Sequence, residues 1–266
     1  MYPPQRVWPY CVLALLLLLA ACSTGTSPSP IPTGTPTELT ATSPAESPAS
    51  PIPTERNSFT DARKNMVENQ IEQRGVSDAA VLESMRTVPR HHFVTSDYLE
   101  QAYDDHPLPI GFGQTISQPY IVALMSETLQ VESGEKVLEV GTGSGYQAAV
   151  LAEMGLEVYT VEIIPELAER ASQVLQDLGY TNVAVLAADG YFGWEEHAPY
   201  DAIIVTAAPD HLPQPLANQL KEGGRLVIPI GPIGAVQTLW LFENIDGELE
   251  ASNLGAVRFV PLTGER

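Results

Sequence analysis

The sequence predicts an α/β domain with a mostly parallel sheet and helices on both faces, and three observations lead to this prediction. Short apolar runs alternate with helical patterns between residues 136 and 230. The first of these runs leads directly into a glycine-rich loop, Gly141-Thr142-Gly143-Ser144-Gly145, and the next one ends at an acidic residue, Glu162. Alternating strands and helices favour a parallel sheet. A glycine loop followed by such an acid is typical of a Rossmann-like nucleotide site.

The N-terminal part of the chain is not expected to belong to this domain. Arg6 precedes an apolar run, residues 11–21, that is too short to span a bilayer comfortably and has the composition of a signal peptide. The run ends in Leu19-Ala20-Ala21-Cys22, which resembles the lipobox of bacterial lipoproteins. The resemblance implies removal of residues 1–21, a lipid anchor on Cys22, and a location on the extracytoplasmic (periplasmic or cell-surface) side of a bacterial membrane. An ordinary signal peptide and an uncleaved anchor are the alternatives.

Residues 22–57 are dominated by Ser, Thr, Pro, Ala and Gly. Such a composition cannot bury a core, so it predicts a disordered, partly extended tether ahead of a folded domain at 58–266. The chain has two cysteines, Cys11 and Cys22, and both precede that domain. The domain is therefore expected to contain no disulfide and no cysteine ligand to a metal.

Two helices are expected at the start of the domain. Apolar residues at roughly helical spacing begin at Phe59, and Gly75 suits the end of that helix. Ser77 is expected to cap a second helix, which Pro89 terminates.

A Pro- and Gly-rich segment, residues 90–115, is expected to form a long irregular loop that covers a site. Ser117 follows this loop and precedes an apolar helical pattern over residues 121–129. Ser117 is therefore expected to cap that helix, as well as to serve the site.

The alternating region supplies the sheet. Its strand candidates are Lys136–Val140, Glu157–Val161, Val183–Leu186, Asp201–Thr206 and Arg225–Ile230. Its helix candidates are Tyr146–Met154, Pro165–Leu178 and Gln214–Leu220. Two further strands, Gln237–Glu243 and Ala256–Val260, joined through the turn Asp246-Gly247, predict an antiparallel hairpin at the edge of the sheet.

The ligand site is expected where the parallel strands end. The glycines let the backbone approach a ligand, and Glu162 can hold ribose hydroxyls. Asp189 is expected to accept a hydrogen bond from an adenine amino group, beside Gly190, which leaves room for a flat ring. The glycine spacing is G-x-G-x-G, with Tyr146 where a dinucleotide fingerprint has Gly or Ala. This spacing favours S-adenosylmethionine as the cofactor, and NAD is the alternative.

The charge and the histidines exclude other classes of partner. The net charge is −20, with 33 acidic against 13 basic residues, so a nucleic-acid partner is not expected. The five histidines match no spacing of metal ligands, and no metal is expected. We expect a monomer.

Several motifs together resemble the protein-L-isoaspartate O-methyltransferase family. They are Arg86-x-x-Pro89-Arg90-His91-x-Phe93-Val94, Pro107 to Tyr120 (PLPIGFGQTISQPY), Leu138 to Ala148 (LEVGTGSGYQA), Asp189-Gly190, Val205-Thr206-Ala207-Ala208 and Phe259-Val260-Pro261-Leu262-Thr263. The resemblance extends from Phe59 to Thr263, and the motifs occur in the order typical of the family.

The resemblance implies a class I S-adenosylmethionine-dependent methyltransferase with a seven-stranded sheet, which methylates the carboxylate of L-isoaspartyl residues in damaged proteins and so repairs them. Ser117 matches the family's active-site serine and is expected to hold or orient that carboxylate. A carboxylate is ionised at neutral pH, so no strong general base is expected. The expected cofactor-binding residues are Gln114, Thr115, Ile116, Glu139, Gly141, Thr142, Gly143, Ser144, Gly145, Glu162, Asp189, Gly190 and Thr206.

Two other functions stay open at this point. The first is a small-molecule or nucleic-acid methyltransferase on the same fold. The second is a surface-anchored binding protein that has kept the fold and lost the chemistry, because the expected extracytoplasmic location separates the domain from cytosolic S-adenosylmethionine.

Overall fold

The computed structural model describes residues 53–264 of the chain. The expected signal segment 1–21, the expected lipid anchor at Cys22 and most of the expected tether 22–57 lie outside the described residues. Within the described part, no helix combines the length and the apolar character needed to cross a membrane. The first helix, α1 (Pro53–Met66), begins ahead of the domain start expected at Ser58.

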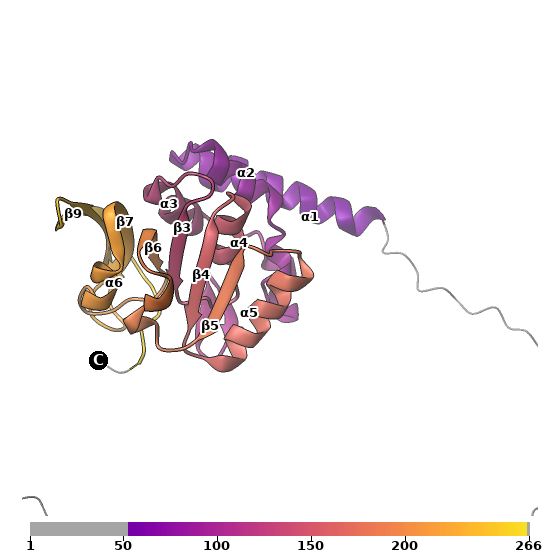
Figure 1. Cartoon of the computed structure of the whole chain (residues 1–266). Helices are drawn as coiled ribbons and strands as arrows, with labels where there is room; N and C mark the ends of the chain where they lie inside the picture. The colour runs from indigo at the N-terminus through magenta and orange to yellow at the C-terminus, as the bar shows by residue number, and fades with distance from the viewer. Residues whose placement is uncertain (1–52, 265–266) are drawn as a thin grey trace, which may run out of the picture. The chain divides into compact units, whose positions relative to one another are not determined.

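The part of the chain that precedes the main sheet forms several helices and a two-stranded hairpin (Figure 1). Its elements are α1 (Pro53–Met66), the π-helical η1 (Val67–Ile71), the 3-10 turn η2 (Glu72–Arg74), α2 (Ala79–Thr87), the 3-10 turns η3 (Arg90–His92) and η4 (Ser96–Gln101), β1 (Leu108–Gly111), β2 (Gln114–Ile116) and α3 (Pro119–Leu129). Gly75 ends the first helical stretch in the left-handed conformation, at φ 98°, as predicted. The prediction that Ser77 caps α2 is wrong, because Asp78 holds that position and its Oδ1 accepts from the N–H of Val81 at 2.9 Å.

Two expectations for the segment before α3 are corrected by the structure. The segment 90–115 is not irregular throughout, since β1 and β2 form an antiparallel hairpin within it. The turn of this hairpin is Phe112-Gly113, and both residues have positive φ, 54° and 73°, as a tight two-residue hairpin turn requires. Ser117 does not cap α3. Gln118 occupies the N-cap position, and α3 has no side-chain cap.

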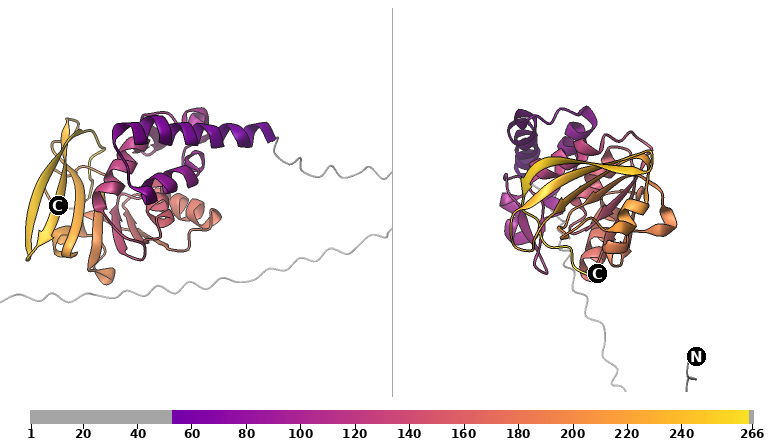
Figure 2. Two further views of the ribbon diagram at one scale, coloured as in Figure 1. Left: turned by 90° about the horizontal axis from the view of Figure 1, so that it is seen from above. Right: turned by 90° about the vertical axis from the view of Figure 1, so that its left-hand side faces the viewer.

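The main sheet has seven strands in the order β5-β4-β3-β6-β7-β8-β9. The elements that build it are β3 (Lys136–Val140), α4 (Tyr146–Glu153), β4 (Glu157–Glu162), α5 (Pro165–Asp177), β5 (Val183–Ala187), η5 (Gly190–Phe192), η6 (Glu195–His197), β6 (Tyr200–Val205), α6 (Gln214–Asn218), β7 (Leu220–Ile230), β8 (Gln237–Ile245) and β9 (Glu248–Val257). Strands β3 to β7 are parallel, and β8 is antiparallel to both β7 and β9. Figure 2 shows these last strands, in yellow, at one edge of the sheet. The predicted fold class is confirmed.

Two predicted boundaries at the end of the chain are wrong. Leu220, expected in a helix, begins β7, and α6 before it is only five residues long. The last strand is β9 rather than the predicted 256–260. The turn Asp246-Gly247 is so tight that Ile245 already pairs with Glu248, and pairing with β8 therefore begins directly after the turn.

Alternation along the strands divides the apolar core into two layers. Val137 of β3 packs in a cluster with buried side chains of α2, α3, α4 and α5. Its neighbour Leu138 packs in a second cluster, with Leu216 of α6. Successive side chains of a strand point to opposite faces, so strands buried on both faces are mainly apolar, and the buried Glu139 of β3 is an exception. This packing fixes the strand ends where the candidate site lies.

Candidate active site

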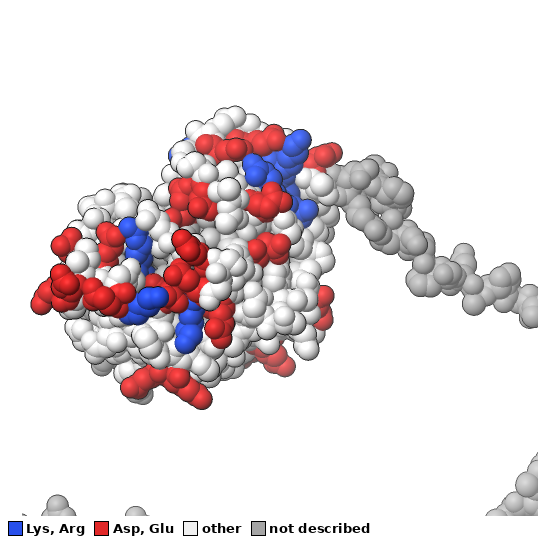
Figure 3. Space-filling model, turned by 45° about the horizontal axis from the view of Figure 1, so that its top comes forward, with Lys and Arg blue, Asp and Glu red and all other residues white. Residues whose placement is uncertain are grey.

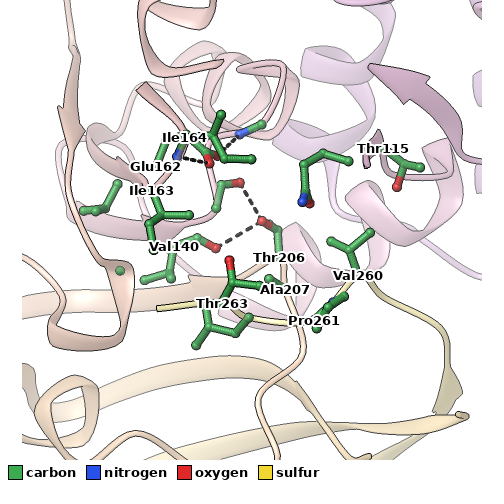
Figure 4. A pocket seen from close by; sticks show the side chains of 16 residues that line it. Thr115, Val140, Glu162, Ile163, Ile164, Thr206, Ala207, Val260, Pro261 and Thr263 are labelled. Carbon is green, nitrogen blue, oxygen red and sulfur yellow. Dashed lines mark hydrogen bonds between the residues drawn. The ribbon is translucent and has the colours of Figure 1, made fainter. Parts of the chain in front are cut away.

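A crevice opens at the carboxyl ends of β3, β4 and β6, where the sequence predicts the ligand site (Figure 4). Its walls come from these strand ends, from β2 and from the segment that follows β9. The residues that line it are Gln114, Thr115, Val140, Gly141, Gly143, Val161, Glu162, Ile163, Ile164, Gly190, Thr206, Ala207, Val260, Pro261, Leu262 and Thr263.

The glycine loop forms one wall of the crevice as bare backbone. Gly141 has φ 97°, and a Cβ there would lie 2.5 Å from Oγ1 of Thr206. The N–H of Gly141 donates to the carbonyl of Val161 at 2.8 Å. Its carbonyl oxygen accepts from the Thr206 hydroxyl at 2.6 Å. These contacts hold the ends of β3, β4 and β6 together, and both the backbone angle and the close contact require glycine.

Glu162 holds its carboxylate in one orientation at the end of β4. Its side chain is almost fully buried, with Oε2 accepting from the N–H of Gly143 at 2.8 Å and Oε1 from the N–H of Ile164 at 3.0 Å (Figure 4). Each carboxylate oxygen has more than one acceptor site. The carboxylate can therefore still accept hydrogen bonds from the paired hydroxyls of a ribose in the crevice.

A smaller cavity, the chamber, adjoins the crevice at the glycine loop. The two cavities share Thr115, Gly141, Gly143 and Thr206. The other residues of the chamber are Ile116, Ser117, Val122, Glu139, Thr142, Ser144, Tyr146 and Gln147. The chamber is therefore mostly polar.

Glu139 is the carboxyl group among the residues that line the chamber, and it is fully buried. Its Oε2 accepts from the hydroxyl of Thr160 at 2.5 Å, and that hydroxyl lies 2.6 Å from the hydroxyl of Thr142. Its Oε1 has no hydrogen-bond partner among the described residues. Burial raises the pKa of Glu139 to about 8, and the nearby Glu162 adds to this, against the lowering effect of the Thr160 hydrogen bond. A cationic ligand group in the chamber would favour the ionised carboxylate.

A third and larger cavity, the groove, meets the other two at the same place. Its volume is about 650 Å³ against about 50 Å³ for the crevice, so the groove has far more room for a peptide segment than the crevice. Thr115 and Thr206 line all three cavities. The other residues of the groove are Arg74, Pro107, Ser117, Gln118, Tyr120, Ile121, Leu124, Val236, Leu239, Leu254, Ala256, Val257, Arg258, Phe259 and Val260. We call the meeting point at Thr115 and Thr206 the junction.

Ser117 lines both the groove and the chamber. Its hydroxyl makes no hydrogen bond with any described residue, and the N-cap of α3 is the next residue, Gln118. The neighbouring Gln118 fixes the backbone, because its Nε2 donates to Oδ1 of Asp105 at 2.8 Å, and Asp105 in turn pairs with Arg74 at 3.1 Å. A hydroxyl held at this position can donate to a carboxylate that enters from the groove.

The structure brings most of the predicted site residues together. Twelve of them line the three cavities: Gln114, Thr115, Ile116, Ser117, Glu139, Gly141, Thr142, Gly143, Ser144, Glu162, Gly190 and Thr206.

Two predicted site residues do not line these cavities. Gly145 caps α4, and a Cβ there would lie 3.3 Å from Ala171 of α5. The Oδ1 of Asp189 accepts from the N–H of Tyr191 at 2.9 Å, and Gly264 packs so closely on its carboxylate that a Cβ at 264 would clash. Asp189 thus does not line the three cavities, and its contact with adenine stays a prediction.

Sequence reasoning missed the wall formed by residues 260–263. Val260 and Leu262 hold this segment against the end of β6: Ala208 donates to the Val260 carbonyl at 2.8 Å, and Leu262 donates to the Ala208 carbonyl at 2.9 Å. A segment more than 50 residues away from β6 gives no local sign of such a contact. The family motif at 259–263 could have indicated this wall, but it contains no charged residue that would suggest a ligand contact.

The fold and the site together define a class I S-adenosylmethionine-dependent methyltransferase, with a glycine loop after the first parallel strand, an acid after the next, and the ligand crevice at the carboxyl ends of the strands. More specifically, the chain belongs to the protein-L-isoaspartate(D-aspartate) O-methyltransferase family, whose model matches residues 61–266.

Individual relatives agree with this assignment. The chain is 56% identical over 201 residues to the protein-L-isoaspartate O-methyltransferase of Gloeobacter violaceus. This match covers 76% of this chain and 98% of the relative. It is 60% identical over 190 residues to protein-L-isoaspartate O-methyltransferase 2 of Polaromonas sp., covering 71% of this chain and 90% of the relative.

Solved structures are similar as well. One protein-L-isoaspartate O-methyltransferase superposes with a TM-score of 0.71 at 34% identity, covering 76% of this chain and 66% of that one. A beta-aspartate methyltransferase (PCMT) from Plasmodium falciparum, in complex with S-adenosyl-L-homocysteine, superposes with a TM-score of 0.65 at 26% identity. The match covers 77% of this chain and 98% of that one. The predicted enzyme class and cofactor are thereby confirmed. Among the described residues, no cluster of His, Cys, Asp and Glu could hold a metal ion.

Proposed function

We propose that this chain transfers a methyl group from S-adenosylmethionine to the free carboxylate of L-isoaspartyl residues in damaged proteins. The observation that carries the proposal is the junction, where the crevice at the strand ends, the polar chamber and the larger groove meet at Thr115 and Thr206. The cofactor's nucleoside fits the crevice, with Glu162 on the ribose. Its amino-acid part fits the chamber beside Glu139, and the peptide lies in the groove.

The residues at the junction need only align the reactants. Bound S-adenosylmethionine supplies a methyl group on a positively charged sulfur, which already is a good leaving group. The substrate carboxylate, with a pKa of about 4, is ionised at neutral pH and needs no base. Ser117 orients that carboxylate by donating its hydroxyl proton in a hydrogen bond. Alignment of the two reactants supplies most of the rate enhancement.

A methyl-transfer assay tests this function. An isoaspartyl peptide and its normal aspartyl twin are incubated with the protein and methyl-labelled S-adenosylmethionine, and labelled ester is counted. We expect ester only on the isoaspartyl peptide. Equal labelling of both peptides would indicate a different methyltransferase. Absence of labelling together with absence of heat on titration with S-adenosylhomocysteine would favour a binding protein that has lost the chemistry.

We further propose that the enzyme works as a monomer anchored through lipid on Cys22, on the extracytoplasmic side of a bacterial membrane. The support is the sequence before residue 58, namely the short apolar run, the lipobox-like Leu19-Ala20-Ala21-Cys22 and the Pro-rich stretch after it. Cells that express the chain and its Cys22→Ser variant are labelled with a radioactive fatty acid and fractionated. We expect label on the wild type alone and its recovery with membranes. Unlabelled wild-type protein would contradict the anchor.

A further inference from the structure

The groove differs in charge from the molecule as a whole. The chain carries a net charge of −20, and acidic side chains are spread over the face shown in Figure 3. Two arginines, Arg74 and Arg258, line the groove, and within residues 53–264 no Asp or Glu does so. The lining of the groove therefore has arginines and no carboxylate, in a protein whose net charge is strongly negative.

The two arginines are not equally available to a ligand. Arg74 pairs with Asp105 at 3.1 Å, and its guanidinium carbon lies 3.5 Å from the centre of the Tyr120 ring. Arg258 is exposed and makes no hydrogen bond or ion pair with any described residue. Arg258 is thus the cation that can engage a substrate group.

The backbone on both sides of Arg258 is fixed. Val257 pairs with Gln237 at the end of β9, and Phe259 donates its N–H to Oε1 of the same Gln237 at 2.9 Å. Val260, two residues after Arg258, lines both the groove and the crevice. Arg258 therefore lies on a wall that is held on both sides of it and that runs from the groove to the crevice.

We propose that Arg258 forms a subsite for a second substrate carboxylate, one that does not react, so that the enzyme prefers isoaspartyl peptides with an acidic residue two or three positions from the isoaspartyl residue. This inference rests on the proposed function. An extended peptide advances about 3.3 Å per residue, as does the extended chain from Val260 to Arg258. When the isoaspartyl residue lies beside Val260, where the groove meets the crevice, a peptide side chain two or three positions away lies beside Arg258. A guanidinium binds a carboxylate through paired N–H donors. Without Arg258, the net negative charge of the protein would disfavour such peptides.

The test uses the full-length protein and a series of matched isoaspartyl peptides, with Glu, Gln or Lys placed in turn at each of the three positions on either side. We expect kcat/KM for the Glu peptide to exceed that for the Gln peptide about three- to fivefold at the responsive positions, through KM. The preference should shrink in about 0.5 M salt, which screens exposed charges.

Variants assign the preference to Arg258. Arg258→Gln should lower the Glu-to-Gln ratio to one or below, whereas Arg258→Lys should keep part of it. Lys64→Gln removes the same charge from an exposed side chain on α1 that pairs with Glu68 and lines no part of the groove, and it should leave the ratio at its wild-type value.

Two results would overturn the inference alone. These are equal kcat/KM for the Glu and Gln peptides in the wild type, and a preference that survives in Arg258→Gln. In both cases the peptides are still methylated, and the proposed function stands. If no isoaspartyl peptide is methylated, the proposed function is refuted, and the inference is refuted with it.

Discussion

Replacing Glu139 with glutamine should remove a pH dependence of folding stability that arises from this one buried carboxyl. Burial raises the pKa of Glu139 to about 8 in the folded protein, against 4.5 for an unperturbed glutamate. Between these values the folded state keeps a proton that the unfolded state releases. The free energy of unfolding therefore falls as the pH rises through this range. Glutamine can still accept the hydrogen bond from Thr160 and carries no charge.

The magnitude follows from the difference between the two pKa values of Glu139. Each unit of that difference is worth about 1.4 kcal/mol, so the contribution lost between pH 4.5 and pH 8 is about 5 kcal/mol. At pH 5 the wild type and Glu139→Gln should differ by less than about 1 kcal/mol from this cause. At pH 8 the variant should be the more stable protein by several kcal/mol, a large part of the roughly 5–15 kcal/mol that stabilises a typical domain.

The assay is urea unfolding at pH 5, 6, 7 and 8, followed by tryptophan fluorescence, without cofactor. The control is Glu83→Gln, which makes the same chemical change on a side chain that is 73% exposed. Its stability should follow that of the wild type at each pH. If the Glu139→Gln protein also shows the wild-type slope against pH, the carboxyl is not held protonated in the fold, and the reasoning fails.

The other predictions concern the site and the tether. Ser117→Ala should lower kcat about 100-fold with an unchanged melting temperature, because Ser117 caps no helix; near-normal turnover would reject its role. Gly141→Ala should abolish calorimetric binding of S-adenosylhomocysteine and cost about 2–3 kcal/mol of stability, because its Cβ would lie 2.5 Å from Oγ1 of Thr206. Removing residues 1–52, ahead of α1, should leave a soluble domain with full activity toward isoaspartyl peptides, and an insoluble or inactive product would count against the tether.

The parts of the fold and site that could be predicted from the sequence depend on local patterns. The strand Lys136–Val140 has the predicted bounds, because its apolar run is enclosed by a charged residue and a glycine. The positions of Gly141 and Glu162 in the crevice follow from the order of strands, since parallel strands end at the same edge of the sheet. Local spacing was sufficient in each case.

The parts that could not be predicted depend on contacts between distant residues. Asp189 follows a strand as predicted, yet it caps the turn η5 and packs against Gly264, at the far end of the chain. Patterns at the start of a helix locate its N-cap only to within about one residue. The N-caps predicted at Ser77 and Ser117 are in fact the next residues, Asp78 and Gln118. The raised pKa of Glu139 results from complete burial in the folded state, which is a tertiary property.

The distribution of charge around the junction suits the reaction between the two ligands. The cofactor is a cation, and the carboxyl groups of Glu139 and Glu162 line the chamber and the crevice proposed for it, where a cation favours the ionised form of Glu139. Arg258 lines the groove proposed for the peptide. At the junction itself the side chains of Thr115 and Thr206 are neutral. Methyl transfer from a sulfonium to a carboxylate cancels both charges, so the transition state is less charged than the bound reactants. A fixed charge at the junction would stabilise one reactant more than the transition state and slow the reaction. In the proposed reaction the neutral hydroxyl of Ser117 orients the carboxylate without this cost.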